Sequence, residues 1–368
     1  MDNRQGALED MVGTGWKNRR VYLTGHTGFK GSWMSLWLSS MGAEVHGYAR
    51  APESDPNLFT SARVGERIEH EVGDVRELPA LEHSIAAFKP EVVFHMAAQP
   101  LVRRSYANPI ETYSTNVMGT AHVLDAIRRV PSVRAVVVIT TDKCYENHES
   151  LVGYREDDRL GGFDPYSNSK ACAELVTAAY RSSFFPVSRL AEHNVALATA
   201  RAGNVIGGGD WSEDRLIPDL VRGFLSGKPV QIRNPRAIRP WQHVLEPLAG
   251  YLALAEHLLQ DGAGISGAWN FGPADEDAWP VGRIADSIAA AWGNGARWVH
   301  DSAENPHEAG CLMLDAGKAR GKLGWRPLLP LDIGLRWLVE WFAAWQRGED
   351  MQAFTLHQIA DYEALRMQ

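Results

Sequence analysis

A glycine-rich turn between an apolar strand and a helix, near the start of the chain, constrains the fold more than any other feature. The segment 21–41 reads VYLTGHTGFKGSWMSLWLSSM and carries Gly25, Gly28 and Gly31 at regular spacing. In a strand–turn–helix unit this spacing permits a sharp turn, a close approach of backbone to a phosphate, and tight packing of the helix on a sheet. The free N–H groups at the helix start, together with the helix dipole, form a site for a pyrophosphate. Glycines at this spacing also occur in plain turns, but the order of strand, turn and helix predicts dinucleotide binding.

Composition and charge exclude several classes of protein. The 368 residues are 45% hydrophobic and 22% charged, which is typical of a globular chain long enough for two packed domains. The net charge of -8 provides no basic surface, so we expect no nucleic-acid partner. No apolar run approaches the ~20 residues of a membrane span, and the first residues lack the apolar core of a signal peptide. We therefore expect a cytoplasmic protein with no membrane partner.

The cysteines indicate neither a disulfide framework nor a zinc site. Cys144, Cys172 and Cys311 are widely separated, and no CxxC pair is present. Such sparse cysteines suit a reducing compartment, where disulfides are rare. We therefore expect free thiols and no bound metal.

Alternating apolar strands and helices follow the glycine turn and predict a doubly wound parallel α/β sheet of the Rossmann type. Strands are expected at 21–24, 44–49, 68–75, 91–95, 135–140, 195–200 and 268–272, and the longer helices at 109–129, 166–180, 246–260, 280–292 and 330–346. The run AVVVIT at 135–140 is typical of a strand buried on both faces. We expect residues 18–203 with about 244–267 to form the dinucleotide-binding domain, 204–243 with 268–368 a smaller α/β substrate-binding domain, and 1–17 a loose extension.

The residues expected to hold the dinucleotide follow the carboxyl ends of the first parallel strands. Arg50 stands where an acidic residue usually holds the adenosine ribose; it could contact a 2′-phosphate and favour NADP, or it could simply be solvated. Asp74 could accept a hydrogen bond from the adenine amino group or cap the next helix. The full set is Gly25, Thr27, Gly28, Phe29, Lys30, Gly31, Arg50, Asp74, Val75, Ala97, Ala98 and Gln99, together with Tyr166 and Lys170.

A second cluster of polar residues follows the strand at 135–140. Thr141 comes directly after the strand, and Tyr166 and Lys170 form a Y-x-x-x-K motif farther on. On a helix the tyrosine and the lysine share a face, so the ammonium is expected to lower the pKa of the phenol toward neutrality. With a strand-end threonine and a nucleotide loop, the motif predicts a phenolate general base beside the bound dinucleotide.

Two later segments are also candidates for the site. The run RAGNVIGGGDW at 201–211 is too long for a simple turn and is expected to line the site. The segment QIRNPRAIRPWQHV at 231–244 gathers arginines in a chain that is acidic overall. Arginines in a loop rimmed by Trp241 and His243 suit a pyrophosphate, although a solvated basic loop is the structural alternative.

These motifs together resemble the extended short-chain dehydrogenase/reductase superfamily, and longer stretches resemble its CDP-glucose 4,6-dehydratases. The stretches are LTGHTGFKGSW (23–33), HMAAQPLVRRSY (95–106), TDKCYEN (141–147), RAGNVIGGGDWSEDRLIPD (201–219) and RPWQHVLEPLAGY (239–251). The resemblance covers about residues 16–345. It implies bound NAD, the nucleotide sugar CDP-glucose as substrate, and a homodimer or homotetramer. The family generally uses NAD, which outweighs the preference for NADP that Arg50 indicates.

The resemblance also implies a role for each residue of the second cluster. The implied reaction oxidises the sugar C4 hydroxyl, eliminates water across C5 and C6, and returns the hydride to C6, giving CDP-4-keto-6-deoxy-D-glucose. Tyr166 would be the base at C4, Lys170 would lower its pKa and hold the nicotinamide ribose, and Thr141 would hydrogen-bond the C4 oxygen. Asp142 would protonate the C6 hydroxyl. Lys143, where relatives carry Glu, would remove the C5 proton or stabilise the enolate.

Some alternatives remain open from the sequence. Asp142 and Lys143 could instead form an ion pair that closes a loop. A 4-epimerase or reductase of a nucleotide sugar on the same scaffold would share Tyr166 and Lys170 but would not need Asp142 as an acid. A cofactor-sensing regulator would not need Thr141, Tyr166 and Lys170 together. For a dehydratase, substrate binding is expected from Arg103, Ser105, Asn204, Arg215, Arg239, His243 and His307.

Overall fold

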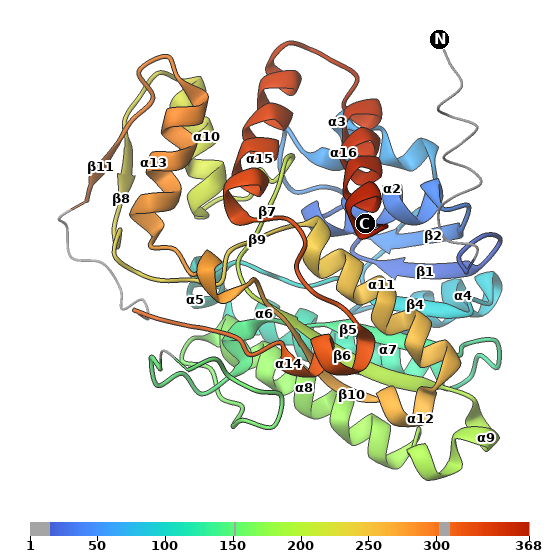
Figure 1. The fold of residues 1–368 in the computed structure, drawn as a ribbon. Helices are drawn as coiled ribbons and strands as arrows, with labels where there is room; N and C mark the ends of the chain where they lie inside the picture. Colours follow the sequence, from blue (N-terminus) through green and yellow to red (C-terminus); the bar gives the residue numbers. More distant parts are fainter. Residues whose placement is uncertain (1–14, 151, 302–309, 368) are drawn as a thin grey trace.

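A parallel sheet forms the centre of the protein in the computed structural model, which describes residues 15–150, 152–301 and 310–367. Within these residues the sheet is seven-stranded, in the order β10-β6-β5-β4-β1-β2-β3, and every neighbouring pair is parallel (Figure 1). Its strands are β1 (Arg20–Thr24), β2 (Glu44–Ala49), β3 (Glu69–Val72), β4 (Val92–His95), β5 (Ala135–Ile139), β6 (Ala196–Ala202) and β10 (Gly267–Phe271). The doubly wound fold is therefore confirmed, and the strand order reverses between β1 and β4.

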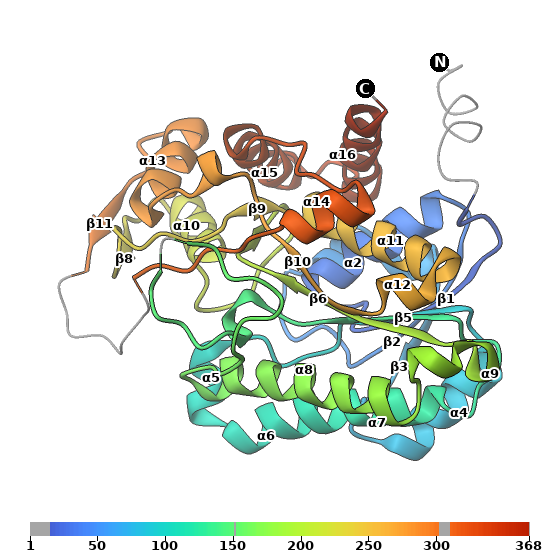
Figure 2. The same cartoon turned by 60° about the horizontal axis from the view of Figure 1, so that its bottom comes forward.

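Helices cover both faces of this sheet (Figure 2). One face carries α4 (Leu78–Phe88), α7 (Gly119–Ile127) and α8 (Pro165–Ser183), and the other carries α2 (Phe29–Ser40) and α11 (Leu245–Gln260). Successive strand residues alternate between two cores: Val21 and Leu23 pack into the cluster of α2 and α11, whereas Tyr22 packs into that of α4 and α7. Burial on both faces explains why β5 is an unbroken run of Ala, Val and Ile.

The remaining elements extend the helical layers and build the smaller part of the molecule. The other helices are α3 (Leu58–Ser61), α5 (Val102–Ala107), α6 (Pro109–Tyr113), α9 (Leu190–His193), α10 (Leu216–Leu225), α12 (Gly262–Ile265), α13 (Val281–Trp292), α14 (Gly317–Leu323), α15 (Leu331–Gln346) and α16 (Met351–Arg366). Single turns are η1 (Val64–Glu66), η2 (Ser114–Met118), η3 (Asp142–Cys144), η4 (Val187–Arg189) and η5 (Asp275–Asp277). Two short parallel pairs join β8 (Val230–Ile232) to β11 (Trp298–His300) and β7 (Val205–Ile206) to β9 (Gln242–His243). The sequence analysis did not predict α16 or these short strands.

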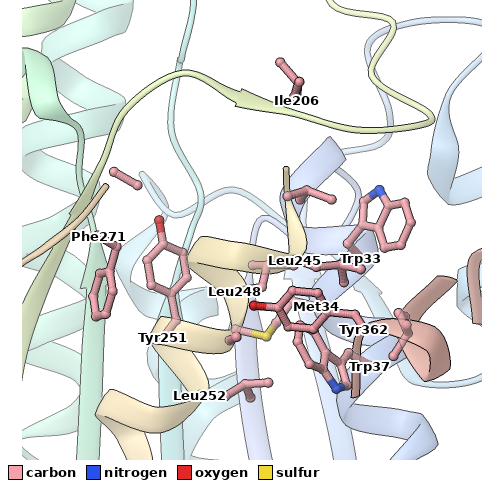
Figure 3. Close-up of a cluster of buried hydrophobic side chains, with 14 of the residues drawn as sticks. Trp33, Met34, Trp37, Ile206, Leu245, Leu248, Tyr251, Leu252, Phe271 and Tyr362 are labelled. Carbon is pink, nitrogen blue, oxygen red and sulfur yellow. The ribbon is translucent and has the colours of Figure 1, made fainter. Parts of the chain in front are cut away.

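The aromatic face of α2 joins the sheet to the C-terminal helices (Figure 3). Trp33 donates its indole N–H to the carbonyl of Gly208 at 3.0 Å, and Trp37 packs edge-on against Tyr362 of α16 with 5.7 Å between ring centroids. Each buried tryptophan removes roughly 150–250 Å² from water, a stabilisation of about 4–6 kcal/mol. One continuous core thus spans both parts of the chain, and the proposed division into two domains stays a prediction.

The N-terminal boundary differs from the expectation. Residues 1–14 lie outside the described residues, but Trp16 is only 1% exposed. Its ring lies 6.2 Å from that of Phe94, and its indole nitrogen hydrogen-bonds Glu256 of α11. The folded part therefore begins before residue 17, because this tryptophan belongs to the core. No described helix combines the length and the apolar character needed to cross a membrane.

Gly208 offers a test of how tightly the two parts are packed. A Cβ at this position would lie 1.9 Å from Cγ of Trp341, whereas one at Gly321 in α14 would meet no atom within 4 Å. Gly208→Ala should lower the free energy of unfolding by about 1–3 kcal/mol because of overpacking. Gly321→Ala should be neutral or stabilise by up to about 1 kcal/mol, since alanine favours the helix. Urea denaturation followed by circular dichroism measures both, and equal stabilities would contradict the prediction.

Candidate active site

A cavity of about 830 Å³ opens at the carboxyl edge of the sheet. Its walls include residues that follow β4 (Met96, Ala98), β5 (Thr140 to Lys143) and β6 (Gly203, Asn204). The start of α8, the start of α10 and the segment 230–241 close the other sides. Ligands of doubly wound sheets bind at this edge, next to the point where the strand order reverses. The cavity therefore lies where a cofactor and a substrate would meet.

Thr141, Asp142 and Lys143 form one rigid turn at the end of β5. The Thr141 hydroxyl donates to Asp142 Oδ1 at 3.0 Å and accepts the Lys143 backbone N–H at 3.4 Å, which caps η3. Asp142 is 2% exposed, and its Oδ2 has no hydrogen-bond partner among the described residues. Burial raises the pKa of Asp142 and lowers the pKa of Lys143, although the charge of each opposes the shift of the other. Burial thus favours a protonated carboxyl beside a neutral amine, the forms required of a general acid and a general base.

The N-terminus of α8 is fixed from two sides. Asp164 caps the helix by accepting a backbone N–H of the first turn at 2.9 Å, and Pro165 is the first helical residue. Ser105 accepts the backbone N–H of Tyr166 at 3.1 Å and donates to a carbonyl of α5. Ser105 is fully buried and does not line the cavity. The expectation that it binds substrate is therefore replaced by a role in positioning Tyr166.

Tyr166 and Lys170 both face the cavity, as their spacing predicts. Burial raises the pKa of Tyr166 to about 12, although a hydrogen bond with Thr141 and the charge of Arg215 both lower this pKa. Lys170 donates to the carbonyl of Ile139 at 2.9 Å, and burial lowers its own pKa to about 8. The expected lowering of the phenol pKa by Lys170 is not found here, because the ammonium is aimed at the end of β5.

All three arginines expected at the substrate side line the cavity. They are Arg103, Arg215 and Arg239. Asn204, the expected amide, lines the cavity as well. Arg215 pairs with the buried Asp210 at 3.2 Å, so its guanidinium is held in place. Arg233, from the arginine-rich segment, also lines the cavity and was not among the residues assigned to binding. Guanidinium groups bind phosphate oxygens through parallel hydrogen bonds, so this wall suits a pyrophosphate.

The GGGDW segment contributes less to the cavity than expected. Of its residues only Asp210 lines the wall. A Cβ at Gly208 would strike Trp341, and Trp211 packs edge-on against Phe342 with 5.2 Å between centroids. Gly208 is therefore required by its packing against α15, whereas a Cβ at Gly207 or Gly209 would lie 2.8 Å from Val244 or Leu58.

His243 lies in the core and not at the cavity. It is 1% exposed and packs edge-on between Trp33 and Trp337, with centroid distances of 6.0 and 5.8 Å. Burial lowers its pKa to about 3, so the ring is neutral. The prediction that it binds substrate is corrected, since the pairing of β9 with β7 turns this side chain under α15. His307, also expected at the substrate side, lies outside the described residues.

The glycine loop has the geometry of a pyrophosphate cradle. Gly25 adopts a φ of 79°, and a Cβ there would lie 2.6 Å from the backbone nitrogen of Ala97. A Cβ at Gly31 would lie 2.1 Å from the carbonyl oxygen of Gly25, so only glycine lets α2 pack this closely. Gly28 is the N-cap of α2 and supplies no side-chain cap, which leaves the first N–H groups of the helix for an anion. These residues fit a dinucleotide.

Arg50 and Asp74 lie along the sheet edge beside the cradle. The hydroxyl of Thr27, in the glycine loop, donates to the backbone carbonyl of Arg50 at 2.8 Å. Asp74 accepts the backbone N–H of Arg76 at 2.9 Å and pairs with its guanidinium. Neither Arg50 nor Asp74 lines the cavity, which covers the inner end of the cofactor region only.

The residues after β3 and β4 differ in their surroundings. Ala98 lines the cavity, and its neighbour Ala97 packs against the glycine loop. Gln99 is buried, and its backbone N–H donates to Asn116 at 2.8 Å. Val75 is 4% exposed and belongs to the core between the sheet and α7. Of these four residues, only Ala98 lines the cavity.

Lys30 was expected on the cofactor side, and its side chain reaches into the cavity. Its ammonium lies 5.8 Å from the ring centroid of Tyr251, whose buried hydroxyl has no partner among the described residues. Burial, with the nearby charges of Lys170 and Arg215, lowers the pKa of Lys30 to about 7. No local pattern in the sequence indicates Tyr251, because only the packing of α11 on the sheet brings it near Tyr166.

Replacing Lys30 with methionine tests this burial. A lysine with a native pKa of about 7 and an unfolded pKa of about 10.4 binds fewer protons in the native state between these values, so wild-type stability should rise with pH there. Lys30→Met should be more stable than the wild type near pH 7, by about 1–3 kcal/mol, and the gap should close toward pH 10. Urea denaturation over this pH range measures it. The exposed Lys228→Met is the control, and a gap of the same size and slope in both variants would contradict the prediction.

Comparison with known proteins agrees with the geometry of the site. The family model described as GDP-mannose 4,6 dehydratase matches residues 23–337. A CDP-glucose 4,6-dehydratase from Salmonella typhimurium is 55% identical over 94% of this chain and 97% of its own length. A crystal structure of dTDP-glucose 4,6-dehydratase from Bacillus anthracis in complex with NAD superposes with a TM-score of 0.72 at 20% identity, covering 90% of this chain and 98% of that chain. MoeE5 in complex with UDP-glucuronic acid and NAD superposes with a TM-score of 0.73 at 25% identity, covering 88% and 99%. The chain therefore belongs to the GDP-mannose 4,6 dehydratase family.

Proposed function

We propose that this protein is a CDP-glucose 4,6-dehydratase that works with bound NAD. The observation that carries the proposal is that Asp142, which is buried, and Lys143, which is partly buried, share one cavity with Thr141 and Tyr166. Identity of 55% to the Salmonella enzyme over nearly the whole chain supports the choice of CDP-glucose. The glycine cradle supports a dinucleotide, and the MoeE5 complex contains NAD on the same fold.

Tyr166 and Thr141 would act on the sugar C4 hydroxyl. NAD, when bound, supplies the hydride acceptance and return that the overall reaction requires. Tyr166 takes the hydroxyl proton, and Thr141 holds the C4 oxygen while the ketone forms. The Thr141 hydrogen bond and the positive charge of Arg215 favour the phenolate, in opposition to burial.

Asp142 and Lys143 would carry out the elimination. Once C4 is a ketone, the C5 proton becomes acidic, and the neutral amine of Lys143 removes it. Asp142 gives its proton to the C6 hydroxyl, which leaves as water. After the hydride reaches C6, the Lys143 ammonium returns a proton to C5, and the product is CDP-4-keto-6-deoxy-D-glucose. Each residue starts in the protonation state that burial favours, and positioned proton transfer of this kind typically contributes ~10²–10⁴-fold in rate.

The substrate pyrophosphate would bind at the arginine wall. The overall charge of -8 repels an anion, so local guanidinium groups must hold it. We assign this role to Arg215 and Arg239, assisted by Arg103 and Asn204, which line the same wall. Asp210 orients Arg215 and reduces the net charge that the wall presents.

We also propose that the protein is a cytoplasmic homodimer or homotetramer. Large apolar side chains are exposed along α6, η2 and α8, with exposed fractions of 80% at Ile110, 50% at Met118 and 58% at Leu175. The same helical face of a second subunit would cover these side chains. The cysteines are free, which suits a reducing compartment.

Incubation of the purified protein with CDP-glucose tests the proposed activity. The expected product has lost one water and acquires the alkaline absorbance of a 4-keto-6-deoxy sugar, with no net formation of reduced cofactor. Mass spectrometry with and without added NAD follows the conversion and shows how firmly the cofactor is held. If CDP-, UDP-, dTDP- and GDP-glucose all remained unchanged, the dehydratase assignment would be refuted.

Asp142→Asn separates a dehydratase from an epimerase on the same scaffold. The amide keeps the shape but has no proton to give, so dehydration should fall by ~10²–10⁴-fold. Asp214→Asn is the matched control, since this carboxylate also lines the cavity but is partly exposed and paired with Arg103 at 3.2 Å. Turnover by Asp142→Asn comparable to that of Asp214→Asn would remove Asp142 from its role.

Lys143→Arg distinguishes a base from an electrostatic stabiliser. Arginine retains the positive charge but does not lose its proton in proteins, so it cannot remove the C5 proton. Both Lys143→Arg and Lys143→Met should therefore lose dehydration by ~10²-fold or more, measured as kcat for the keto product. Substantial activity in Lys143→Arg alone would assign the residue to stabilising the enolate.

A further inference from the structure

Arg50 stands at the position that reads the adenosine ribose in dinucleotide-binding folds. It follows β2, which ends at Ala49, and its backbone carbonyl accepts the hydroxyl of Thr27 from the glycine cradle at 2.8 Å. In such folds an acidic residue at this position binds the 2′-hydroxyl of NAD, whereas a nearby arginine accommodates the 2′-phosphate of NADP. An unengaged Arg50 would therefore favour NADP.

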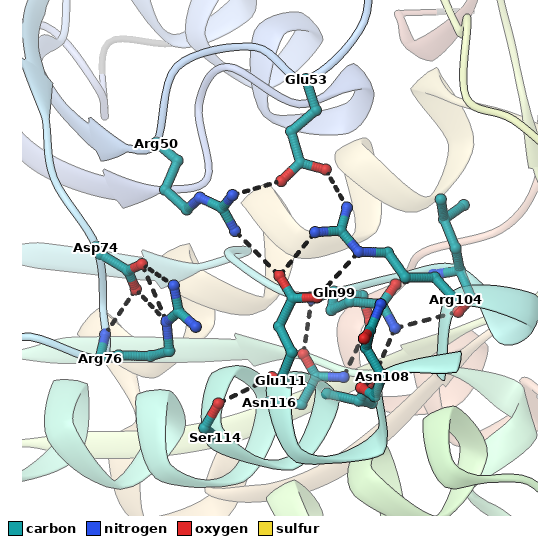
Figure 4. A network of polar contacts seen from close by, with 12 residues as sticks. Arg50, Glu53, Asp74, Arg76, Gln99, Arg104, Asn108, Glu111, Ser114 and Asn116 are labelled. Atoms are coloured by element: carbon teal, nitrogen blue, oxygen red, sulfur yellow. Dashed lines mark hydrogen bonds and ion pairs between the residues drawn. The ribbon is translucent and has the colours of Figure 1, made fainter. Parts of the chain in front are cut away.

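In the structure, however, Arg50 belongs to a closed network of ion pairs (Figure 4). Its Nη2 lies 3.1 Å from Glu53 Oε1, and its Nη1 lies 3.4 Å from Glu111 Oε1. Arg104 closes the ring from α5, with Nη1 at 2.5 Å from Glu53 and Nη2 at 2.7 Å from Glu111. A second contact joins Arg104 Nε to Glu111 Oε2 at 3.1 Å. Both carboxylates are thus shared between the two arginines.

The charges of this network cancel locally. Two guanidinium groups face two carboxylates, and both terminal nitrogens of Arg50 are engaged. The hydrogen bonds from Arg104, followed by those from Arg50, hold the pKa of Glu111 below its usual range, so Glu111 is ionised at neutral pH. The neighbouring Asp74 is likewise paired with Arg76 at 2.5 Å. A dianionic 2′-phosphate would meet carboxylates here, and the arginines Arg50, Arg76 and Arg104 are already paired.

We propose that Glu53 and Glu111 select NAD over NADP by engaging Arg50, which would otherwise bind a 2′-phosphate. The inference rests on the proposed function, because it assumes that the cradle holds a nicotinamide dinucleotide. A 2′-hydroxyl carries no charge, and a carboxylate can accept its hydrogen bond without displacement of Arg50. A 2′-phosphate must break the pairs of Arg50 and approach two anions at contact distance, where salt screens their repulsion weakly.

Cofactor binding by the full chain, measured without substrate, tests the proposal. Isothermal titration with NAD and with NADP is made on the wild type, Glu53→Gln, Glu111→Gln and the double variant. Glutamine keeps the shape and the hydrogen-bonding oxygen but removes the charge. The wild type should prefer NAD, and the double variant should bind NADP roughly five- to tenfold more tightly than the wild type does, as expected for partly exposed charges. The affinity for NAD should change little.

Two further variants separate this selection from a general effect of charge. Adding Arg50→Gln to the double variant should cancel the gain in NADP affinity, since the released guanidinium is what binds the phosphate. Glu66→Gln, at an exposed carboxylate 3.5 Å from Arg63 and outside the network, should leave both affinities unchanged. If the double variant does not fold, the single variant Glu53→Gln takes its place in the titrations, since the Glu53 side chain is half-exposed.

The possible outcomes are distinct. Unchanged NADP affinity in the folded variants, or a gain that persists without Arg50, would overturn the proposal while leaving the proposed function intact. Equal affinity of the wild type for NAD and NADP would also overturn it. Binding of neither dinucleotide by the wild type would refute the proposed function together with the inference drawn from it.

Discussion

The packing of α2 on the sheet supports both the fold and the site. Its first turn lies against the carbonyl of Gly25, which only glycine at position 31 permits, and the N–H groups of that turn form the anion site. The next turns bury Trp33 and Trp37 against α11 and α16 (Figure 3). The helix that holds the cofactor is thus also the joint between the sheet and the smaller part of the chain. A change in this packing would move the cradle and one wall of the cavity together.

Burial decides the chemistry of the cavity more than any single charge pair does. Desolvation is the largest cause of the pKa shifts of Asp142, Lys143, Tyr166 and Lys170. Desolvation favours the protonated carboxyl and the neutral amine, so each group would be available to give or to accept a proton in an elimination that needs both. The same burial opposes the phenolate, so Thr141 and Arg215 are needed beside Tyr166. In the proposed mechanism one buried environment would therefore serve two proton transfers and would require local help for the third.

Charged groups at the rim form a paired network of their own. Arg50, Glu53, Arg104 and Glu111 form a closed set at the outer end of the cofactor region, where water reaches them. Such exposed pairs contribute little to folding stability. These pairs instead determine the local electrostatic potential. The potential is close to neutral at a place where the sequence alone indicated a free arginine.

The sequence by itself determined the sheet, the glycine cradle and the cluster of polar residues that follows β5 and opens α8. Strand patterning, glycine spacing and the Y-x-x-x-K motif are local signals, because each depends on neighbours within a turn or a strand. The tertiary structure alone decided which polar residues reach the cavity. His243 and Gly208 went to the core because α15 packs on them, and Ser105 went beneath Tyr166 because α5 packs on α8. The tertiary structure also paired Arg50 with Glu111, which lies far away in sequence. Burial and long-range pairing depend on how distant segments pack together, and no local pattern of residues encodes that arrangement.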